Sequence, residues 1–139
     1  MSGSKLYRNT KIAVLWCWQN GGYSTDNELI EKLDKMIAHI STSNYLIIGL
    51  HSGTSESRSA QEEALTKKYG DKFFNWREYV STNALYDFGI SPTEEDEAEM
   101  LKGSIPKSLL TDSVHLCAAG YAILGFKIVE RFKNLGYIE

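Results

Sequence analysis

The run Lys11-Ile12-Ala13-Val14-Leu15-Trp16-Cys17-Trp18 decides the fold class of this chain. After Lys11 it is apolar without a break, as expected for a strand that is buried on both faces of a parallel sheet. The segment Gln19-Asn20-Gly21-Gly22 follows at once and indicates a loop. The functional crevice of an open α/β sheet lies beyond the carboxyl ends of its strands, so Asn20 stands where an amide can act on a ligand. The alternative is that Asn20-Gly21 forms only a tight turn.

Helical and strand patterns alternate after this run. Residues 45–50 and 72–76 predict two further strands. Ser24-Thr25-Asp26 offers N-cap oxygens for a helix, and residues 60–69 predict another helix that Ser55 or Ser57 would cap. The apolar stripe of the first helix consists of Leu29, Ile30, Leu33, Met36, Ile37 and Ile40. Alternation of this kind indicates a parallel α/β sheet with helices on both faces.

The C-terminal half of the chain carries clear helix boundaries. Residues 81–90 show no regular pattern, after which Ser91 is predicted to be an N-cap, with Pro92 in the first turn and Glu94 completing a capping box. A last helix is predicted from residue 118 to residue 135, ended by Gly136. Gly120 lies in its first turn, where the missing side chain favours close packing against a neighbour.

Composition limits the classes of function. A chain of 139 residues with 42% hydrophobic and 24% charged residues indicates one globular domain, expected over residues 11–139, with residues 1–10 as a tail or a remnant of cloning. The net charge of −3 argues against nucleic acid as a partner. No apolar run is long enough to predict a membrane span or a secretory signal. The compartment stays open between the cytoplasm and an excised part of an exported protein.

The cysteines and histidines predict neither a metal site nor a cofactor. Cys17 and Cys117 have no C-x-x-C spacing, and they could form one disulfide or remain two buried thiols. His39, His51 and His115 are scattered along the chain without a metal-ligand spacing.

The stretch Asp112-Ser113-Val114-His115-Leu116 is the strongest candidate for chemistry. If Asp112 orients one ring nitrogen of His115, the other nitrogen is free to take a proton from a nucleophile. The alternative is a polar turn that leads into the last helix, in which Asp112 serves the backbone.

These residues resemble the SGNH (GDSL-type) hydrolases, a family of esterases, lipases and carbohydrate deacetylases. The resemblance rests on Asp112-Ser113-Val114-His115-Leu116 with Gly120-Tyr121, and on the first strand with Asn20 after it. It covers residues 11–135 and implies a flavodoxin-like, three-layer α/β/α parallel sheet that is truncated at its N-terminus. It also implies that His115 is the general base, Asp112 its orienting acid and Asn20 a donor in the oxyanion hole.

The chain departs from the family pattern at four places. It contains no Gly-Asp-Ser nucleophile block, and only ten residues precede Lys11. Trp18 and Gly21 stand where the family has Gly and Asp around its Asn. Cys117 occupies the expected N-cap of the last helix, where a thiol is a poor cap that costs on the order of 1 kcal/mol.

We therefore expect the C-terminal part of an SGNH-type carboxyl-ester hydrolase, inactive alone, whose substrate would be an acyl ester or an acetylated carbohydrate. The alternative is a non-catalytic module that binds a glycan or another protein. An exposed sheet edge left by the missing elements predicts a homodimer. A third reading is a self-contained hydrolase that uses Ser52, Ser55 or Cys17 as its nucleophile.

Overall fold

A small parallel sheet forms the centre of the molecule. The computed structural model describes residues 11–139, in which β1 (Ala13–Leu15), β2 (Tyr45–Ile48) and β3 (Phe73–Phe74) form one sheet in the order β1-β2-β3. All pairings are parallel, with Val14 opposite Leu46 and Ile47 opposite Phe73. The expected α/β class with a parallel sheet is confirmed.

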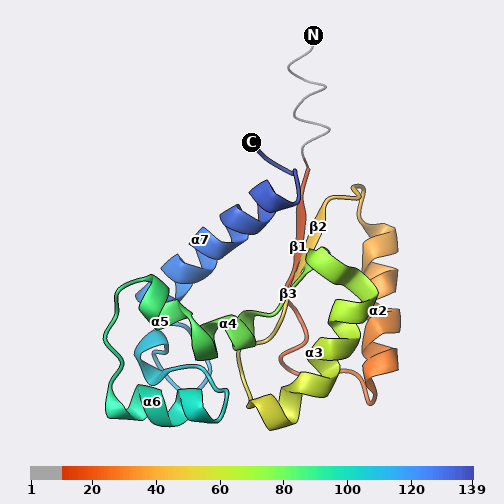
Figure 1. Cartoon of the computed structure of the whole chain (residues 1–139). Helices are drawn as coiled ribbons and strands as arrows, with labels where there is room; N and C mark the ends of the chain where they lie inside the picture. The colour runs from red at the N-terminus through yellow and green to blue at the C-terminus, as the bar shows by residue number, and fades with distance from the viewer. Residues whose placement is uncertain (1–10) are drawn as a thin grey trace.

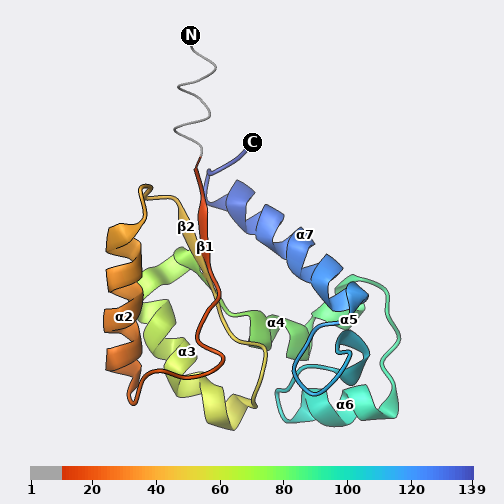
Figure 2. The same ribbon diagram turned by 180° about the vertical axis from the view of Figure 1, so that it is seen from behind.

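Helices cover both faces of this sheet, as predicted. Figures 1 and 2 show α7 (Ala118–Asn134) on one side, and α2 (Asp26–His39) and α3 (Ser55–Tyr69) on the other. Three shorter helices, α4 (Trp76–Thr82), α5 (Ala84–Asp87) and α6 (Glu94–Leu101), follow β3 in the chain. Two 3₁₀ turns, η1 (Gly70–Lys72) and η2 (Lys107–Leu109), complete the elements. Within residues 11–139, no helix has the length and apolar character needed to cross a membrane.

The strands send alternate side chains into two hydrophobic clusters. The cluster on the α7 side contains Leu46, Ile48, Phe74, Trp76, Val80, Ala84, Leu85, Ile105, Leu109, Leu116, Ile123 and Leu124. The cluster on the α2 and α3 side contains Trp18, Leu29, Leu33, Ile47, Leu50, Leu65, Tyr69 and Phe73. The second strand therefore contributes to both cores, which explains why residues 46–50 are all buried.

The helix starts are confirmed in part. Three neighbouring residues, 24–26, are the predicted candidates for the N-cap of α2. The cap is Thr25, whose side chain accepts from the Glu28 N–H. The cap of α3 is Thr54 and not Ser55 or Ser57, and the helix begins five residues earlier than predicted. The cap of α6 is Thr93 and not Ser91, because Asp96 completes the capping box and not Glu94. In both boxes the side chain three residues after the cap decides the start.

Three further predictions are wrong in detail. The first strand is not buried on both faces: β1 spans three residues, and Val14 is 45% exposed because no strand within residues 11–139 lies beyond β1. Residues 81–90 are largely helical, in α4 and α5. The third strand ends at Phe74, because the Asn75 side chain caps α4 by accepting from the Glu78 N–H.

The two edges of the sheet differ. The N–H of Ala13 donates to the Asn44 carbonyl at 2.9 Å, so the alternation of the strand turns the backbone groups of Val14 away from β2. At the other edge, the Arg131 guanidinium donates to the carbonyls of Asp71 and Phe73 at 3.4 Å. The edge at β3 is thus covered by a side chain, and the edge at β1 is open among the described residues.

Candidate functional site

The Asp112–His115 stretch forms the tip of a closed loop. An isolated antiparallel bridge pairs Leu110 with Leu116 at its base. The N–H of Thr111 donates to the His115 carbonyl at 2.8 Å, which closes the loop above this bridge. Leu116 is buried in the core on the α7 side, so the loop is anchored to the body of the domain.

The start of α7 lies directly against the base of this loop. A Cβ atom on Gly120 would lie 2.5 Å from the Leu109 carbonyl oxygen, so the close packing predicted for Gly120 is confirmed. Cys117 is the N-cap of α7, and its thiol makes no capping hydrogen bond to the helix. The thiol donates instead to the Ser108 carbonyl at 3.3 Å.

Asp112 and His115 form the predicted hydrogen-bonded pair. Nδ1 of His115 lies 2.8 Å from Oδ2 of Asp112. Oδ1 of Asp112 accepts from the N–H groups of His115 at 2.7 Å and Val114 at 2.8 Å. These bonds to the carboxylate lower the pKa of Asp112 to about 2, so the group is ionised at neutral pH.

An ionised Asp112 fixes the tautomer of His115. Because the carboxylate can only accept, Nδ1 carries the proton and Nε2 holds a lone pair. Within residues 11–139, no hydrogen bond involves that Nε2. The His115 side chain is 72% exposed, so its basic nitrogen is accessible to a group that approaches from outside. The alternative of a polar turn is also confirmed, because the Asp112 carboxylate accepts from two backbone N–H groups and from the imidazole.

The loops that follow β1 and β2 meet this loop at the carboxyl ends of the strands. Oγ of Ser52 donates to Oε1 of Gln19 at 2.8 Å. Nε2 of His51 lies 2.5 Å from the Val114 carbonyl oxygen. Asn20 is exposed in the turn directly after Gln19, and no hydrogen bond joins it to Asp112 or His115 in the described part of the chain. The structure therefore brings the three loops to one edge and leaves the role predicted for Asn20 as a prediction.

In the described part of the chain, no base contacts any of the three alternative nucleophiles. The Ser52 hydroxyl contacts Gln19 and accepts from Nη2 of Arg58 at 3.3 Å, and neither neighbour can take its proton. The Ser55 hydroxyl accepts from Nη1 of Arg77 at 3.2 Å. Cys17 is an exposed free thiol, which corrects both alternatives offered for it, and partial burial of its sulfur raises its pKa. A raised pKa disfavours the reactive thiolate.

A groove of about 580 Å³ borders the Asp112 side of the loop. Its lining includes hydroxyl side chains from several segments, together with Glu99 and Lys107. The hydroxyl groups are those of Ser52, Thr54, Ser104, Thr111 and Ser113. A substrate held in this groove would lie beside Asp112.

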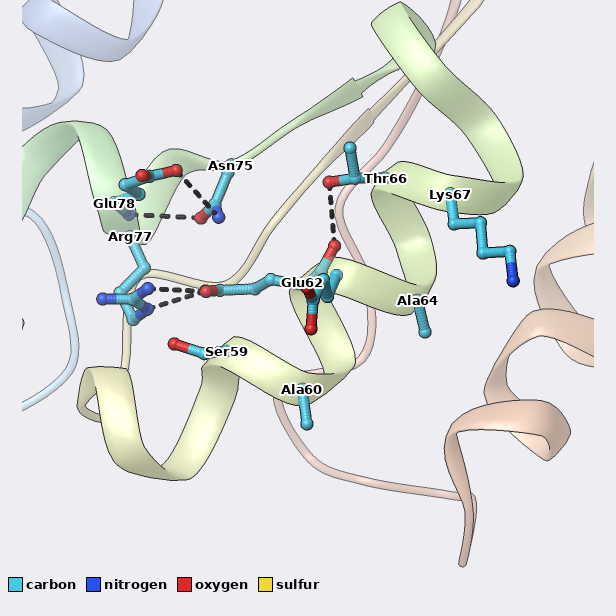
Figure 3. Close-up of a pocket in the computed structure, with 10 residues that line it drawn as sticks. Ser59, Ala60, Glu62, Ala64, Thr66, Lys67, Asn75, Arg77 and Glu78 are labelled. Carbon is cyan, nitrogen blue, oxygen red and sulfur yellow. Dashed lines mark hydrogen bonds and ion pairs between the residues drawn. The ribbon is translucent and has the colours of Figure 1, made fainter.

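A second cavity, of about 830 Å³, lies over α3 and the start of α4 (Figure 3). Its lining residues run from Ser59 to Glu78 and include no histidine or cysteine. The buried Glu62 and Arg77 side chains meet at its wall, where each carboxylate oxygen accepts from the guanidinium. Because this cavity holds an ion pair that already satisfies both partners, it offers less chemistry than the groove beside Asp112.

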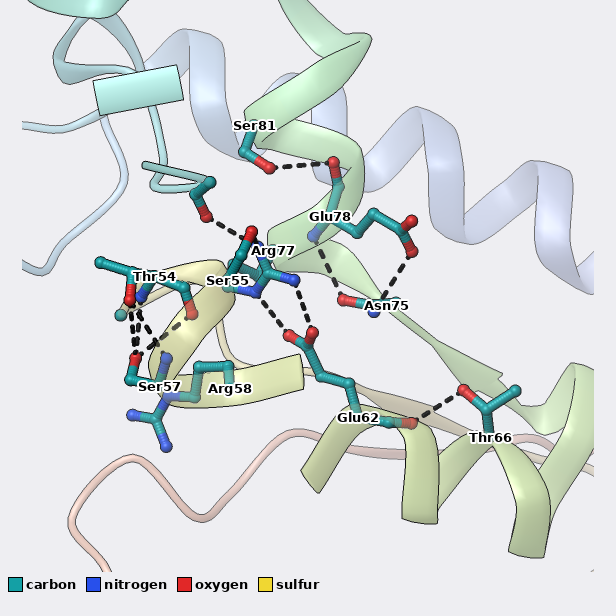
Figure 4. A network of polar contacts seen from close by, with 12 residues as sticks. Thr54, Ser55, Ser57, Arg58, Glu62, Thr66, Asn75, Arg77, Glu78 and Ser81 are labelled. Carbon is teal, nitrogen blue, oxygen red and sulfur yellow. Dashed lines mark hydrogen bonds and ion pairs between the residues drawn. The ribbon is translucent and has the colours of Figure 1, made fainter. Parts of the chain in front are cut away.

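The same ion pair belongs to a polar network that supports the site (Figure 4). Nη1 of Arg77 donates to the Gly103 carbonyl at 2.7 Å, and Oγ of Ser104 donates to the Gly53 carbonyl at 3.0 Å. The first bond fastens the segment that follows α6 to α4, and the second fastens it to the loop that leads into α3. Further along, the buried Asp96 accepts from the N–H and Oγ of Ser108.

Sequence reasoning missed the supporting residues. Arg77, Glu62 and Asp96 are charged residues that are almost fully buried, and nothing in the local patterns of α3, α4 and α6 distinguishes them from solvated charges. His51 had a usable signal, because it is a polar residue directly after the buried apolar run of residues 46–50.

No group of three histidine, cysteine, aspartate or glutamate residues that could hold a metal ion gathers within residues 11–139. No protein-family model, curated protein or solved structure matches the chain. A functional proposal therefore rests on the geometry of the Asp112–His115 pair and on the resemblance of its motif.

Proposed function

We propose that this chain supplies the base and its orienting acid to a carboxyl-ester hydrolase of the SGNH type, on a flavodoxin-like sheet that a further segment completes. The observation that carries the proposal is the 2.8 Å contact between Nδ1 of His115 and an ionised Asp112. The chain contains no Gly-Asp-Ser block, so the nucleophilic serine comes from outside this sequence.

The chemistry follows from the tautomer. Nε2 of His115 takes the proton of the serine hydroxyl as Oγ bonds to the ester carbonyl carbon, and Asp112 stabilises the imidazolium that forms. The Asn20 amide would donate to the oxyanion of the tetrahedral intermediate. The imidazolium then gives its proton to the leaving alcohol, and water releases the acyl group by the same steps.

The completing segment would pair with the edge of β1, which is open among residues 11–139. A strand added parallel to β1 ends at the same edge of the sheet as the loops of Gln19, His51 and Asp112. A serine at the carboxyl end of such a strand would approach His115 from solvent. The exposed side chain of Val14 would be covered by the same addition.

Complementation tests the proposal. The chain is mixed with the N-terminal strand–helix segment of an SGNH hydrolase that carries Gly-Asp-Ser, and hydrolysis of p-nitrophenyl acetate is followed. We expect activity that is lost when the added serine is replaced by alanine. His115→Ala and Asp112→Asn should each reduce it by about 10⁴-fold or more, and Asn20→Ala by about 10²–10³-fold.

The matched control is His39→Ala, which removes an exposed histidine at the end of α2. It should leave the restored activity unchanged. A mixture that forms a stable complex but hydrolyses no ester, or that keeps its activity in His115→Ala, would refute the proposed function. Acetylated sugars assayed beside the phenyl ester distinguish a deacetylase from a general esterase.

A second candidate function is an interaction module that pairs with another copy of the chain. Exposed apolar side chains favour it: Val14 on β1 is 45% exposed, and Tyr121 and Val129, two turns apart on one face of α7, are 52% and 45% exposed. A twofold axis beside β1 would pair the two open edges antiparallel and form a continuous six-stranded sheet.

The two candidates compete for one edge, so one experiment separates them. Light scattering at tens of micromolar should give the mass of a dimer, and Val14→Lys should give a monomer. If the completing segment is the occupant of this edge, its addition should convert the dimer to a 1:1 complex. A wild-type chain that is monomeric throughout this range contradicts the homodimer.

A further inference from the structure

His51 is a buried imidazole that the proposed mechanism does not use. It lies in the loop after β2, separated from the strand by Gly49 and Leu50. Its side chain is 7% exposed and lies beside Trp16, with 5.9 Å between the ring centroids. Its Nε2 is 2.5 Å from the Val114 carbonyl oxygen. A carbonyl only accepts, so Nε2 carries the proton and Nδ1 holds the lone pair. That Nδ1 is buried and has no hydrogen-bond partner among residues 11–139. Burial lowers the pKa of His51, so the ring is neutral at pH 7.

We propose that His51 is a positioning residue for the Asp112–His115 pair, and that it acts by holding the Val114 carbonyl with its Nε2–H. The inference rests on the proposed function, because it gives the pair a role that needs an exact orientation. His51 itself touches neither Asp112 nor a reacting atom.

The planar peptide unit between Val114 and His115 links His51 to the Asp112–His115 pair. The Val114 carbonyl and the His115 N–H belong to the same peptide plane and point in opposite directions. When His51 holds that carbonyl, it directs the His115 N–H toward Oδ1 of Asp112, where the bond is 2.7 Å. The other carboxylate oxygen then lies 2.8 Å from Nδ1 of His115, so the ring is oriented by the same carboxylate.

The surroundings of His51 indicate that a polar residue is needed at this position only for the hydrogen bond to the Val114 carbonyl. An apolar side chain of equal volume would suit the contact with Trp16 and would leave no unpartnered nitrogen in the interior. The only hydrogen bond of the His51 side chain in the described residues goes to Val114. The neutral ring also adds no positive charge beside the imidazolium that His115 forms during proton transfer.

Three substitutions test the inference without any substrate. His51→Phe keeps the ring and removes the donor. His51→Gln places an amide nitrogen close to the position of Nε2, and His51→Asn carries the same amide on a side chain one methylene shorter. The readouts are the ¹³C titration of the Asp112 carboxyl group and the ¹⁵N signals of the His115 ring, which report the Nδ1–H tautomer.

In the folded Phe and Asn variants we expect the pKa of Asp112 to rise from about 2 toward its ordinary value of 3.8, and the Nδ1–H signal of His115 to broaden. The Gln variant should retain both wild-type values, and so should the control His39→Phe. Loss of global stability alone would not change the pKa of Asp112 in molecules that remain folded, so this readout separates positioning from a purely structural role.

The inference is overturned if folded His51→Phe or His51→Asn keeps the Asp112 pKa near 2 with an unchanged His115 ring spectrum. If the Phe variant does not fold, the comparison of the Asn and Gln variants tests the inference, because their side chains carry the same amide and differ only by one methylene in length. Failure of the complementation assay would refute the proposed esterase and leave these spectra as expected. The two failures are therefore distinguishable.

Discussion

Replacing Arg77 by methionine should remove a large part of the stability of this domain. Arg77 and Glu62 are 4% and 9% exposed, with bonds of 2.7 and 2.5 Å between guanidinium and carboxylate. Arg77→Met leaves the Glu62 carboxylate buried without its counter-charge and removes the donor of the Gly103 carbonyl. Breaking a buried pair from one side costs about 3–5 kcal/mol, against a total of about 5–15 kcal/mol for a domain.

Urea denaturation followed by tryptophan fluorescence measures this loss of free energy of unfolding. In thermal denaturation we expect a fall in Tm on the order of 10–20 °C. The double variant Glu62→Leu/Arg77→Met should recover at least half of the loss, because neither charge then remains buried. The control is Lys68→Met, which breaks an exposed 3.5 Å pair with Asp34 and should cost less than about 1 kcal/mol. An Arg77→Met protein within 1 kcal/mol of wild type, about the effect of a surface pair, would refute this account.

Four further outcomes follow from α7 and from His51. Gly120→Ala places its Cβ 2.5 Å from the Leu109 carbonyl oxygen and should cost about 1–3 kcal/mol in urea denaturation. Gly125→Ala, which has open space around it, should instead stabilise the helix by up to about 1 kcal/mol. Cys117→Asn supplies the missing N-cap acceptor and should raise the free energy of unfolding by about 1 kcal/mol; an unchanged value would show that the thiol contact to the Ser108 carbonyl is worth as much. Burial lowers the pKa of His51, so the unfolded chain binds a proton there that the folded chain rejects. The stability from its neutral ring is present above the unfolded pKa of about 6.5 and is lost as the pH falls through that value toward the folded pKa. Urea midpoints between pH 7.5 and 5.5 should therefore fall more in wild type than in His51→Gln, and equal slopes would contradict this.

The sequence predicts the sheet and its long helices because their signals are local. The run at residues 45–50 is apolar enough to be a strand with both faces covered, and all but its first residue are buried. The start of α2 at Thr25 and the predicted end of α7 near Gly136 follow from capping chemistry that a few neighbouring residues decide.

The errors arise where the partner is distant in the sequence. Val14 and Met36 have the apolar character of core residues, yet they are 45% and 41% exposed, because burial depends on elements that local patterns cannot place. Residues 81–90 have no amphipathic period, and α5 forms because Ala84 and Leu85 enter the core that other segments build. Tertiary packing overrides propensity at such positions.

The Asp112–His115 pair could be predicted because both residues lie within one turn of chain. The Asp112 contact to the backbone was the stated alternative, and the structure shows that one carboxylate does both. The part played by His51 could not be predicted, since it depends on a loop 63 residues away.

The unequal edges of the sheet limit how the molecule can grow. On the β3 side, the Phe73 carbonyl that faces outward already accepts from Arg131, and the strand is only two residues long. Among the described residues the sheet has one unoccupied edge, so it can pair with one added strand or with one further copy of the chain, after which no free edge remains. Extension into filaments needs two such edges, so association through β1 stops at two chains.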